Sequence, residues 1–283
     1  MNINWFPGHM FKTQKEIKSM LNMVDIVIEI RDARAVISTT NPDIENLTKC
    51  KPKIIILSKI DLADKNVTRK WIDYYKNQNV CCVDLNIISS KNMNEITNKI
   101  NFVMKDKIEK YKSKGVRNFT VRGMILGIPN VGKSSLINKI SQNSIAKVGN
   151  RPGVTKSKQW IKTNFGIDLL DTPGILWPKF DNEQVGLNLV YIGSIKDEIL
   201  DIEEVSFNLI KFLTENYKKN LELAYKIKLT DDANENLDFI GHKLGCLAKK
   251  SLIDYSRLSK IILNDFRSGK IGLISLESPE DLL

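Results

Sequence analysis

The sequence is poor in the residues that build metal and disulfide sites, with two histidines and four cysteines in 283 residues. The cysteines show no CxxC spacing, and adjacent Cys81 and Cys82 would point to opposite faces of a strand, which disfavours a shared metal site. No apolar run approaches the roughly 18 residues that span a bilayer, and the N-terminus lacks the apolar segment of a secretory signal. These absences predict free thiols, a cytoplasmic location and no membrane partner.

The net charge of +10 is unevenly distributed along the chain. Residues 1–177 contain 29 Lys and Arg against 15 Asp and Glu, whereas residues 178–283 contain 14 against 18. A basic surface attracts acidic partners such as nucleic acid, but lysine-rich faces are commonly only solvated. Charge alone therefore leaves nucleic-acid binding open, and it places the basic excess in the first part of the chain.

Short β-branched runs alternate with helix-like stretches in that first part. We expect strands over 24–30, 53–58, 80–85 and 120–127, and helices around 12–22, 66–78, 92–113 and 133–142. Two further strands, 158–164 and 167–171, are close enough to form a hairpin. Later patterns are helical, including a stretch over 236–250. The sequence predicts an α/β domain with a parallel sheet over 1–177 and a small all-helical domain over 178–283.

GIPNVGKS, residues 127–134, matches the phosphate-binding pattern G-x-x-x-x-G-K-[ST]. It ends an expected strand and opens an expected helix, which is the context that the motif requires. Glycines let backbone N–H groups turn toward phosphate oxygens, and the helix N-terminus adds a partial positive charge. Lys133 would contact the β- and γ-phosphates, and the Ser134 hydroxyl would bind Mg²⁺. The predicted phosphate-binding residues are Asn130, Val131, Gly132, Lys133, Ser134 and Ser135.

Two further motifs follow this P-loop. DTPG, residues 171–174, comes after a strand, so Asp171 is expected to reach Mg²⁺ and the Gly174 N–H to contact the γ-phosphate. Between the P-loop and DTPG, Thr155 is the hydroxyl expected to close over Mg²⁺ when a γ-phosphate is present. Each motif has a plain alternative when taken alone, because Asp, Pro and Gly crowd ordinary turns and a Thr in a basic loop can be a bystander.

Two loops that follow expected strands carry residues suited to a guanine base. In LSKIDL, Asp61 can accept hydrogen bonds from guanine N1–H and N2–H₂, whereas adenine offers neither donor, and Lys59 would lie along the base. In ISSKN, a backbone N–H near Ser90 would bond guanine O6, with the following lysine stacking. A capped strand-to-helix turn is the alternative for the first loop. The predicted base-binding residues are Ser58, Lys59, Asp61, Ser89, Ser90 and Lys91.

The order of these motifs is unusual, because Ras-like GTPases carry the P-loop first and the base motif about a hundred residues later. Here both base motifs precede the P-loop, which is followed by the switch threonine and DTPG. Since each motif acts by its position in space, a circular permutation keeps the site if the old termini lie close together. Five motifs in one cyclic order predict a guanine-nucleotide site more strongly than any motif alone.

On these motifs the chain resembles the circularly permuted GTPases, most closely the ribosome biogenesis GTPase A family, also called YlqF. The resemblance extends to WFPGHM at 5–10, DAR at 32–34, NP at 41–42 and DFRSGKIG near the C-terminus. It implies a circularly permuted Ras-like P-loop domain followed by a helical, RNA-binding domain. It also implies GTP hydrolysis coupled to late assembly of the large ribosomal subunit.

Two positions depart from, or add to, the usual pattern. Ser58 stands where this family usually has Asn, which bridges guanine N7 and the P-loop; the shorter Ser would need a water, at a cost of about 1 kcal/mol. We therefore expect weaker GTP affinity with retained base preference. Asn130 is similar to the Asn with which some GTPases hold K⁺ against the phosphates, which leaves open whether K⁺ stimulates turnover.

The residue that follows DTPG raises the question of how water is activated. Ras-like enzymes use a Gln there, but this chain has Ile175, and an apolar side chain cannot polarise water. Intrinsic hydrolysis should therefore be slow. The resemblance makes His9 in WFPGHM the catalytic candidate, while an N-terminal plug with an incidental histidine stays the alternative.

The sequence thus predicts a GTP- and GDP-binding monomer that is slow alone and activated by the large ribosomal subunit, with ribosomal RNA and proteins as partners. The alternative is a GTP-gated binding module with negligible hydrolysis, for which Ile175 is the best support. An ATP-dependent enzyme is disfavoured by Asp61.

Overall fold

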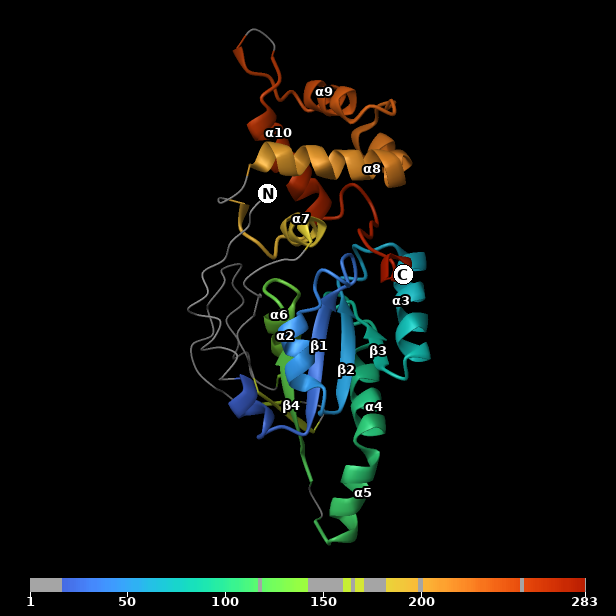
Figure 1. Ribbon diagram of the computed structural model, residues 1–283, viewed down its shortest axis with the longest axis vertical. Coiled ribbons are helices and arrows are strands. Elements are labelled where there is room, and N and C mark those ends of the chain that lie inside the picture. The colour runs from blue at the N-terminus through green and yellow to red at the C-terminus, as the bar shows by residue number, and fades with distance from the viewer. Residues whose placement is uncertain are drawn as a thin grey trace.

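The computed structural model describes residues 17–116, 119–141, 160–163, 166–170, 182–197, 201–249 and 252–282. Within them, strands form one sheet in the order β3-β2-β1-β4-β6-β5 (Figure 1). The strands are β1 (Ile26–Asp32), β2 (Lys53–Ser58), β3 (Cys81–Asp84), β4 (Val121–Leu126), β5 (Trp160–Lys162) and β6 (Ile167–Leu170). Neighbours run parallel except β5 and β6, which form the expected antiparallel hairpin. Counted cyclically from the P-loop strand β4, this is the strand order of a Ras-like sheet.

Helices cover both faces of the sheet, because side chains of successive strand residues alternate between faces. On one face, Ile28 and Ile56 pack with helices α4 (Met93–Val103) and α6 (Lys133–Ile140). On the other, Val27 packs with α2 (Pro42–Thr48) and with the helical residues from 17 onward, and Leu57 packs with α3 (Lys65–Asn77). Every residue of β1 is buried, so the centre of the sheet is the centre of the domain.

A second group of helices lies above the sheet in Figure 1 and forms the expected helical region. It comprises α7 (Glu183–Tyr191), α8 (Ile202–Tyr225), α9 (Ala233–Lys243) and α10 (Tyr255–Arg267). The side chains of Asp201 and Asp232 accept hydrogen bonds from the first N–H groups of α8 and α9, which explains where these helices begin. Among the described residues, no helix is both long and apolar enough to cross a membrane.

Two expectations about helix bounds were wrong, and one helix was missed. The stretch expected over 92–113 is two helices, α4 and α5 (Lys105–Ser113), separated at Met104, whose ψ is 6°. The stretch expected over 236–250 ends at Lys243, and Gly245 follows in the left-handed region at φ 64°. Helix α2 was not expected; Asn41 caps it and Pro42 occupies its first turn, where a proline costs no hydrogen bond.

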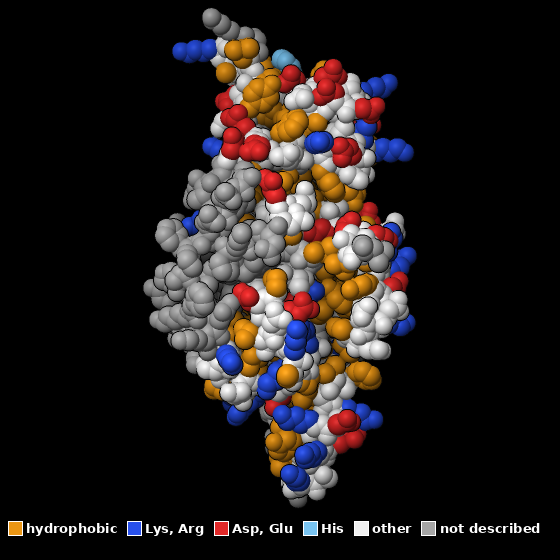
Figure 2. All heavy atoms as spheres, in the orientation of Figure 1, with side chains coloured by type: hydrophobic (Ala, Val, Ile, Leu, Met, Phe, Trp, Pro, Cys, Tyr) orange, Lys and Arg blue, Asp and Glu red, His pale blue; other side chains and the backbone are white. Residues whose placement is uncertain are grey.

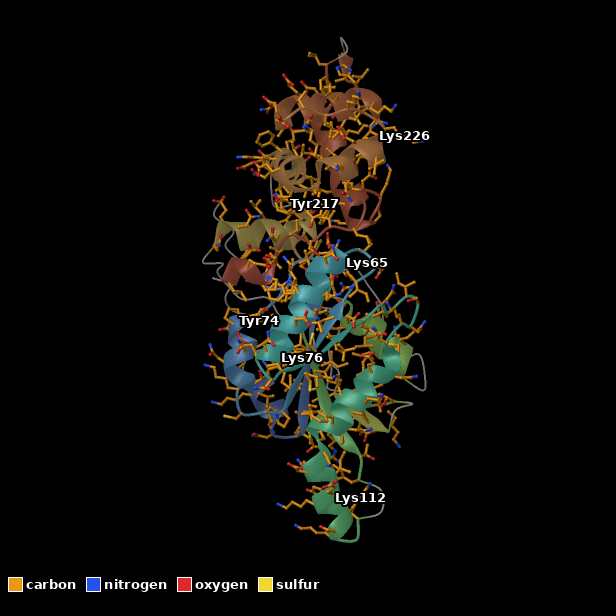
Figure 3. All side chains as sticks on the ribbon, turned by 90° about the vertical axis from the view of Figure 1, so that its right-hand side faces the viewer. Lys65, Tyr74, Lys76, Lys112, Tyr217 and Lys226 are labelled. Atoms are coloured by element: carbon orange, nitrogen blue, oxygen red, sulfur yellow. The ribbon has the colours of Figure 1, made fainter. Side chains whose placement is uncertain are left out.

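Helix α5 projects from the end of the sheet domain that lies away from the helical region (Figure 1). None of its residues is buried, and Lys112 lies near its far end (Figure 3). Near that far end, the rings of Tyr111 and Phe119 stack with centroids 4.2 Å apart.

The C-terminal segment after α10 returns to the first domain. The Ile274 N–H donates to the Leu62 carbonyl at 3.0 Å, and the Leu276 N–H donates to the Arg34 carbonyl at 2.7 Å. The last helical turn, η3 (Pro279–Leu282), lies beside α3, and Figure 1 places the C-terminus there. The helical region is therefore attached to the sheet domain by its final residues as well as through α7.

Candidate guanine-nucleotide site

Three loops that the sequence assigns to one nucleotide leave the carboxyl ends of parallel strands. The base loop follows β2, the second base loop follows β3, and the P-loop follows β4. Carboxyl ends of parallel strands share one edge of a sheet, which is where open α/β sheets bind ligands. Because β1 lies between β2 and β4, its final residues lie between the base loop and the P-loop.

The P-loop has the backbone shape that its glycines permit. Gly127 has φ 155°, and a Cβ there would lie 2.6 Å from the Ile30 carbonyl oxygen. Gly132 has φ 102°, and a Cβ would lie 2.9 Å from Ile87 Cδ1 of the second base loop. A larger residue would press on the backbone of β1 at Gly127 and on the Ile87 side chain at Gly132, and both positions also have a positive φ that favours glycine.

The start of α6 is open toward the loop. Gly132 is the N-cap and provides no side-chain hydrogen bond to the first N–H groups, which leaves backbone donors and the positive end of the helix dipole for an anion. The buried Lys133 Nζ donates to the carbonyl oxygens of Gly127 at 2.9 Å and Ile128 at 2.6 Å. Ser134 and Ser135 are half-buried in the first turn. These positions suit one phosphate group.

Ser58 connects the base loop to the P-loop. Its side chain is fully buried, and its hydroxyl lies 2.6 Å from the Val131 carbonyl oxygen and 3.1 Å from the Arg31 carbonyl oxygen. A hydroxyl has one proton to donate, and the shorter distance assigns it to Val131. The expectation that the serine would need a water was wrong for the P-loop half of the bridge, because the direct contact is made.

Lys59 and Asp61 follow in a tight turn. Lys59 has φ 55°, and the Leu62 N–H donates to its carbonyl at 2.9 Å. The Lys59 ammonium pairs with Asp32 at 3.0 Å, and its side chain is 25% exposed. Burial lowers the pKa of Lys59, with Asp32 opposing that effect. Asp61 is half-buried, and Asp64 caps α3 just beyond it.

Asparagines hold the second base loop. The Ser89 N–H donates to Asn86 Oδ1 at 3.0 Å, and Asn92 Nδ2 donates to the Asp84 carbonyl at 2.9 Å. Ser90 adopts φ 59° between these bonds. Ser89 and Lys91 are exposed, and Ser90 is half-buried. Since Ile87 of this loop also lies against Gly132, the structure brings both base loops to the P-loop as expected.

Comparison with known proteins agrees with this arrangement. The family model described as "50S ribosome-binding GTPase" matches residues 122–238. The ribosome biogenesis GTPase A of Bacillus pumilus is 43% identical over 281 residues, covering 99% of this chain and 100% of the relative. The chain belongs to the ribosome biogenesis GTPase A family. The family member from Thermotoga maritima is 30% identical over 281 residues, covering 99% of this chain and 96% of the relative.

Solved structures of YlqF give the same result. The GDP-bound form matches with a TM-score of 0.66 and 26% identity, over 94% of this chain and 100% of the other. The GNP-bound YlqF from T. maritima matches with a TM-score of 0.65 and 26% identity, over 95% and 99%. The family, the fold class and the GTPase activity predicted from the sequence are thereby confirmed.

Several predicted site residues of this GTPase lie outside the described residues. They are His9, Thr155, Asp171, Gly174 and Ile175. Of the predicted Mg²⁺ ligands, Ser134 is therefore the one whose surroundings are described. The proposed domain boundary at 177–178 also falls outside them.

Two residues of this family member that the sequence analysis gave no role lie directly behind the base loop. Asp32 is the last residue of β1 and Arg34 lies two residues beyond it, and both are buried, with relative exposures of 0% and 1%. The signal that could have singled them out is a run of charges at and just beyond the end of a strand rich in Ile and Val, because buried charges are retained only where they are paired. Both belong to the DAR segment, residues 32–34, that the chain shares with the family.

Proposed function

We propose that this chain hydrolyses GTP as an assembly factor for the large ribosomal subunit, acting as a cytoplasmic monomer. The observation that carries the proposal is the contact of the Ser58 hydroxyl with the Val131 carbonyl, because it fixes the base loop against the P-loop. A nucleotide bridging the two loops then has its guanine and its phosphates held by one rigid unit. The role in the ribosome rests on the relatives, which are named ribosome biogenesis GTPases.

In this proposal the base is recognised by the two loops after β2 and β3. Asp61 accepts from guanine N1–H and N2–H₂, Lys59 covers the base, and the Ser90 N–H bonds O6, with Ser89 and Lys91 at the rim. Ser58 supports the P-loop rather than the base, since its hydroxyl proton is used on Val131. We therefore expect guanine preference with reduced affinity.

The phosphates are proposed to bind at the start of α6. Lys133 exchanges its two backbone carbonyl partners for phosphate oxygens, and the open N–H groups after Gly132 surround the β-phosphate. Ser134 would hold Mg²⁺ together with Thr155 and Asp171, and the ion supplies neutralisation of phosphate charge when bound. Gly174 would contact the γ-phosphate.

Asn130 is proposed to hold K⁺ through its side-chain oxygen. Its Nδ2 donates to the Gly193 carbonyl at 2.6 Å, which orients the amide and directs the oxygen to other partners. A carbonyl-type oxygen beside a phosphate-binding loop is a suitable donor for a monovalent cation.

Hydrolysis is proposed to be slow until the ribosomal particle completes the site. Ile175 provides no group to orient water, and we assign that function to His9. The helical domain, 178–283, and the basic first domain would both contact ribosomal RNA or proteins. The two parts differ in charge on the face shown in Figure 2. Asp and Glu are prominent on the helical region, whereas Lys and Arg gather toward α5, so RNA phosphates would favour the first domain.

The deciding experiment measures multiple-turnover phosphate release with and without purified large subunits, for the wild type and His9→Ala. We expect strong stimulation that the substitution removes. An unstimulated wild type would favour the GTP-gated binding module, and full stimulation of His9→Ala would return the histidine to a structural role.

A further inference from the structure

A buried carboxylate lies between two cations behind the base loop. Asp32 at the end of β1 is fully buried, and its Oδ2 lies 3.0 Å from the Lys59 ammonium and 2.8 Å from Arg34 Nη2. Its Oδ1 accepts from Arg34 Nε and from the Arg34 N–H, both at 3.0 Å. Both oxygens of the Asp32 carboxylate therefore contact cations, and they fix the side chains of Lys59 and Arg34.

We propose that Asp32 is a positioning residue for guanine binding, because it fixes the side chain of Lys59 in the orientation that covers the base. This inference rests on the proposed function, which assigns Lys59 to the base. A lysine has a flexible four-carbon stem and loses much rotamer freedom when it is held in one geometry. An ion pair with a fully buried partner stays strong because water screens it little. With Asp32 in place, that ordering is complete before the nucleotide arrives.

The helical region supports Asp32 from the other side. The Arg34 guanidinium lies over the ring of Phe266 on α10, with Cζ 5.4 Å from the ring centroid. The Arg34 Nη1 atom is buried without a hydrogen-bond partner among the described residues. The cation–π contact with the Phe266 ring offsets part of the cost of burying it. The Arg34 carbonyl accepts from the Leu276 N–H of the C-terminal segment. Lys59 is therefore held by a chain of contacts that begins in the helical domain.

The same strand provides a matched control. Glu29 is 1% exposed and pairs with Arg31 at 2.7 Å and with Lys53 at 3.2 Å. Like Asp32, Glu29 is a buried carboxylate that pairs with the arginine two residues after it and with a lysine. That lysine, Lys53, is the first residue of β2. The Glu29 carboxylate has no contact with Lys59, so Glu29→Gln reports the structural cost of losing such a pair without the positioning effect.

The test compares GDP and pyrophosphate binding by calorimetry in full-length variants. Asp32→Asn should weaken GDP binding about tenfold, the order of a partly desolvated cation–base contact, and leave pyrophosphate binding unchanged. Glu29→Gln should lower the melting temperature comparably and leave GDP binding unchanged. In turnover assays, Asp32→Asn should raise the KM for GTP without changing kcat at saturation, because the chemistry occurs at the other end of the nucleotide.

A double-mutant cycle separates positioning from general damage. Lys59→Ala removes the side chain on which Asp32 acts, so adding Asp32→Asn to Lys59→Ala should weaken GDP binding no further. Additive losses would overturn the proposal, as would a folded Asp32→Asn protein with unchanged GDP affinity. If Asp32→Asn does not fold, Asp32→Glu keeps the charge but moves it by one methylene, and it must weaken GDP binding for the proposal to stand.

Failure of this inference is distinguishable from failure of the proposed function. A wild-type protein that binds ADP as tightly as GDP contradicts the assignment of the guanine site itself. A wild-type protein that prefers GDP, together with an Asp32→Asn variant of equal preference and affinity, contradicts only the role of Asp32.

Discussion

The side-chain amide of Asn130 in the P-loop donates a 2.6 Å hydrogen bond to the carbonyl of Gly193 in the turn after α7. A second bond runs beside it, from the Ser194 hydroxyl to the Pro129 carbonyl at 2.9 Å. Arg267 at the end of α10 holds that turn by donating to the Tyr191 carbonyl and pairing with Asp197. The phosphate-binding loop is therefore in direct contact with the helical region.

Asn130→Ala is expected to abolish any stimulation of turnover by K⁺ over Na⁺. Ser194→Ala is the matched control, because it removes the neighbouring bond between the same two segments but no oxygen that K⁺ could use. Each variant should lose about 1 kcal/mol of unfolding free energy, the usual contribution of one hydrogen bond. Phosphate release in KCl and NaCl checks this, and equal K⁺ stimulation in the wild type and Asn130→Ala would contradict it.

Ser58→Ala is expected to weaken GDP and GTP binding several-fold and to destabilise the protein by about 1–3 kcal/mol. The substitution leaves the Val131 carbonyl buried without its donor, and such a group costs more than the lost bond itself. Chemical denaturation and nucleotide titration measure the two effects. Ser113→Ala, which removes an exposed hydroxyl on α5, should change neither.

Ser58→Asn is expected to strengthen GTP binding, whereas Ser58→Ala weakens it. The amide can contact both the P-loop and the base, so GTP affinity should rise, while the preference for GTP over ATP stays with Asp61. A wild-type protein that binds ATP as tightly as GTP would contradict the assignment of Asp61.

Asp61→Asn is expected to change base preference from guanine to xanthine. The carboxylate accepts from N1–H and N2–H₂, whereas an amide can donate to the O2 that xanthine carries in place of the amino group. GDP binding should fall about a hundredfold, because two bonds to a charged acceptor are replaced by one to a neutral oxygen, and the amide N–H₂ faces the guanine N2–H₂ donor to donor. Competition of GDP and XDP against a fluorescent nucleotide measures this. Asp64→Asn is the control, because that residue caps α3 instead.

Much of this arrangement was predictable from local sequence, and the reasons are physical. Strand β2 is the apolar run 53–58, bounded by a proline before it and polar residues after it, and it was predicted at its observed bounds. The P-loop was predicted because its glycines and lysine have fixed spacing. The break at Met104 was missed because neither glycine nor proline marks it. The contacts of Ser58 with Val131 and of Asp32 with Lys59 were missed because they join residues far apart in sequence.

Glu277 provides a prediction for pH dependence. Its buried carboxylate accepts from the Ile37 N–H at 2.6 Å and from Asn188 Nδ2 at 2.8 Å, and it also contacts Ser38. Burial is the main cause that raises the pKa of Glu277 above its usual value of 4.5. The folded state then binds the proton more tightly than the unfolded state, so this contribution to stability falls as pH rises from 4.5 through the folded pKa.

Glu277→Gln should remove that part of the pH dependence and cost about 1–3 kcal/mol at neutral pH, because an amide nitrogen cannot accept from these donors. Unfolding free energy measured between pH 4.5 and 8 checks both statements. Glu280→Gln is the control, since its pair with Lys70 is exposed and contributes little. A parallel pH profile for the wild type and Glu277→Gln would contradict the prediction.

Thiol labelling tests the packing between α3 and the sheet. Burial is the main cause that raises the pKa of the Cys82 thiol to about 12, so it stays protonated and poorly reactive at pH 8. Cys50 is exposed, and Cys246 is buried in the helical region. Iodoacetamide should modify Cys50 first, the partly buried Cys82 more slowly because its thiol stays protonated, and the buried Cys246 only in denaturant. Modification of Cys82 at the rate of Cys50 would contradict the packing described.

The return of the C-terminal segment limits how the two parts of the molecule can move. A domain joined by one linker can swing widely, but this helical region is held at one side through Gly193 and at the other through Leu276. The first contact is made by Asn130 of the phosphate loop, and the second by Arg34, which supports the base loop through Asp32. Movement that keeps both contacts is a rotation about the line joining them. A tilt of the helical region would then reach both ends of one bound nucleotide, the phosphates through Asn130 and the base through Arg34 and Asp32.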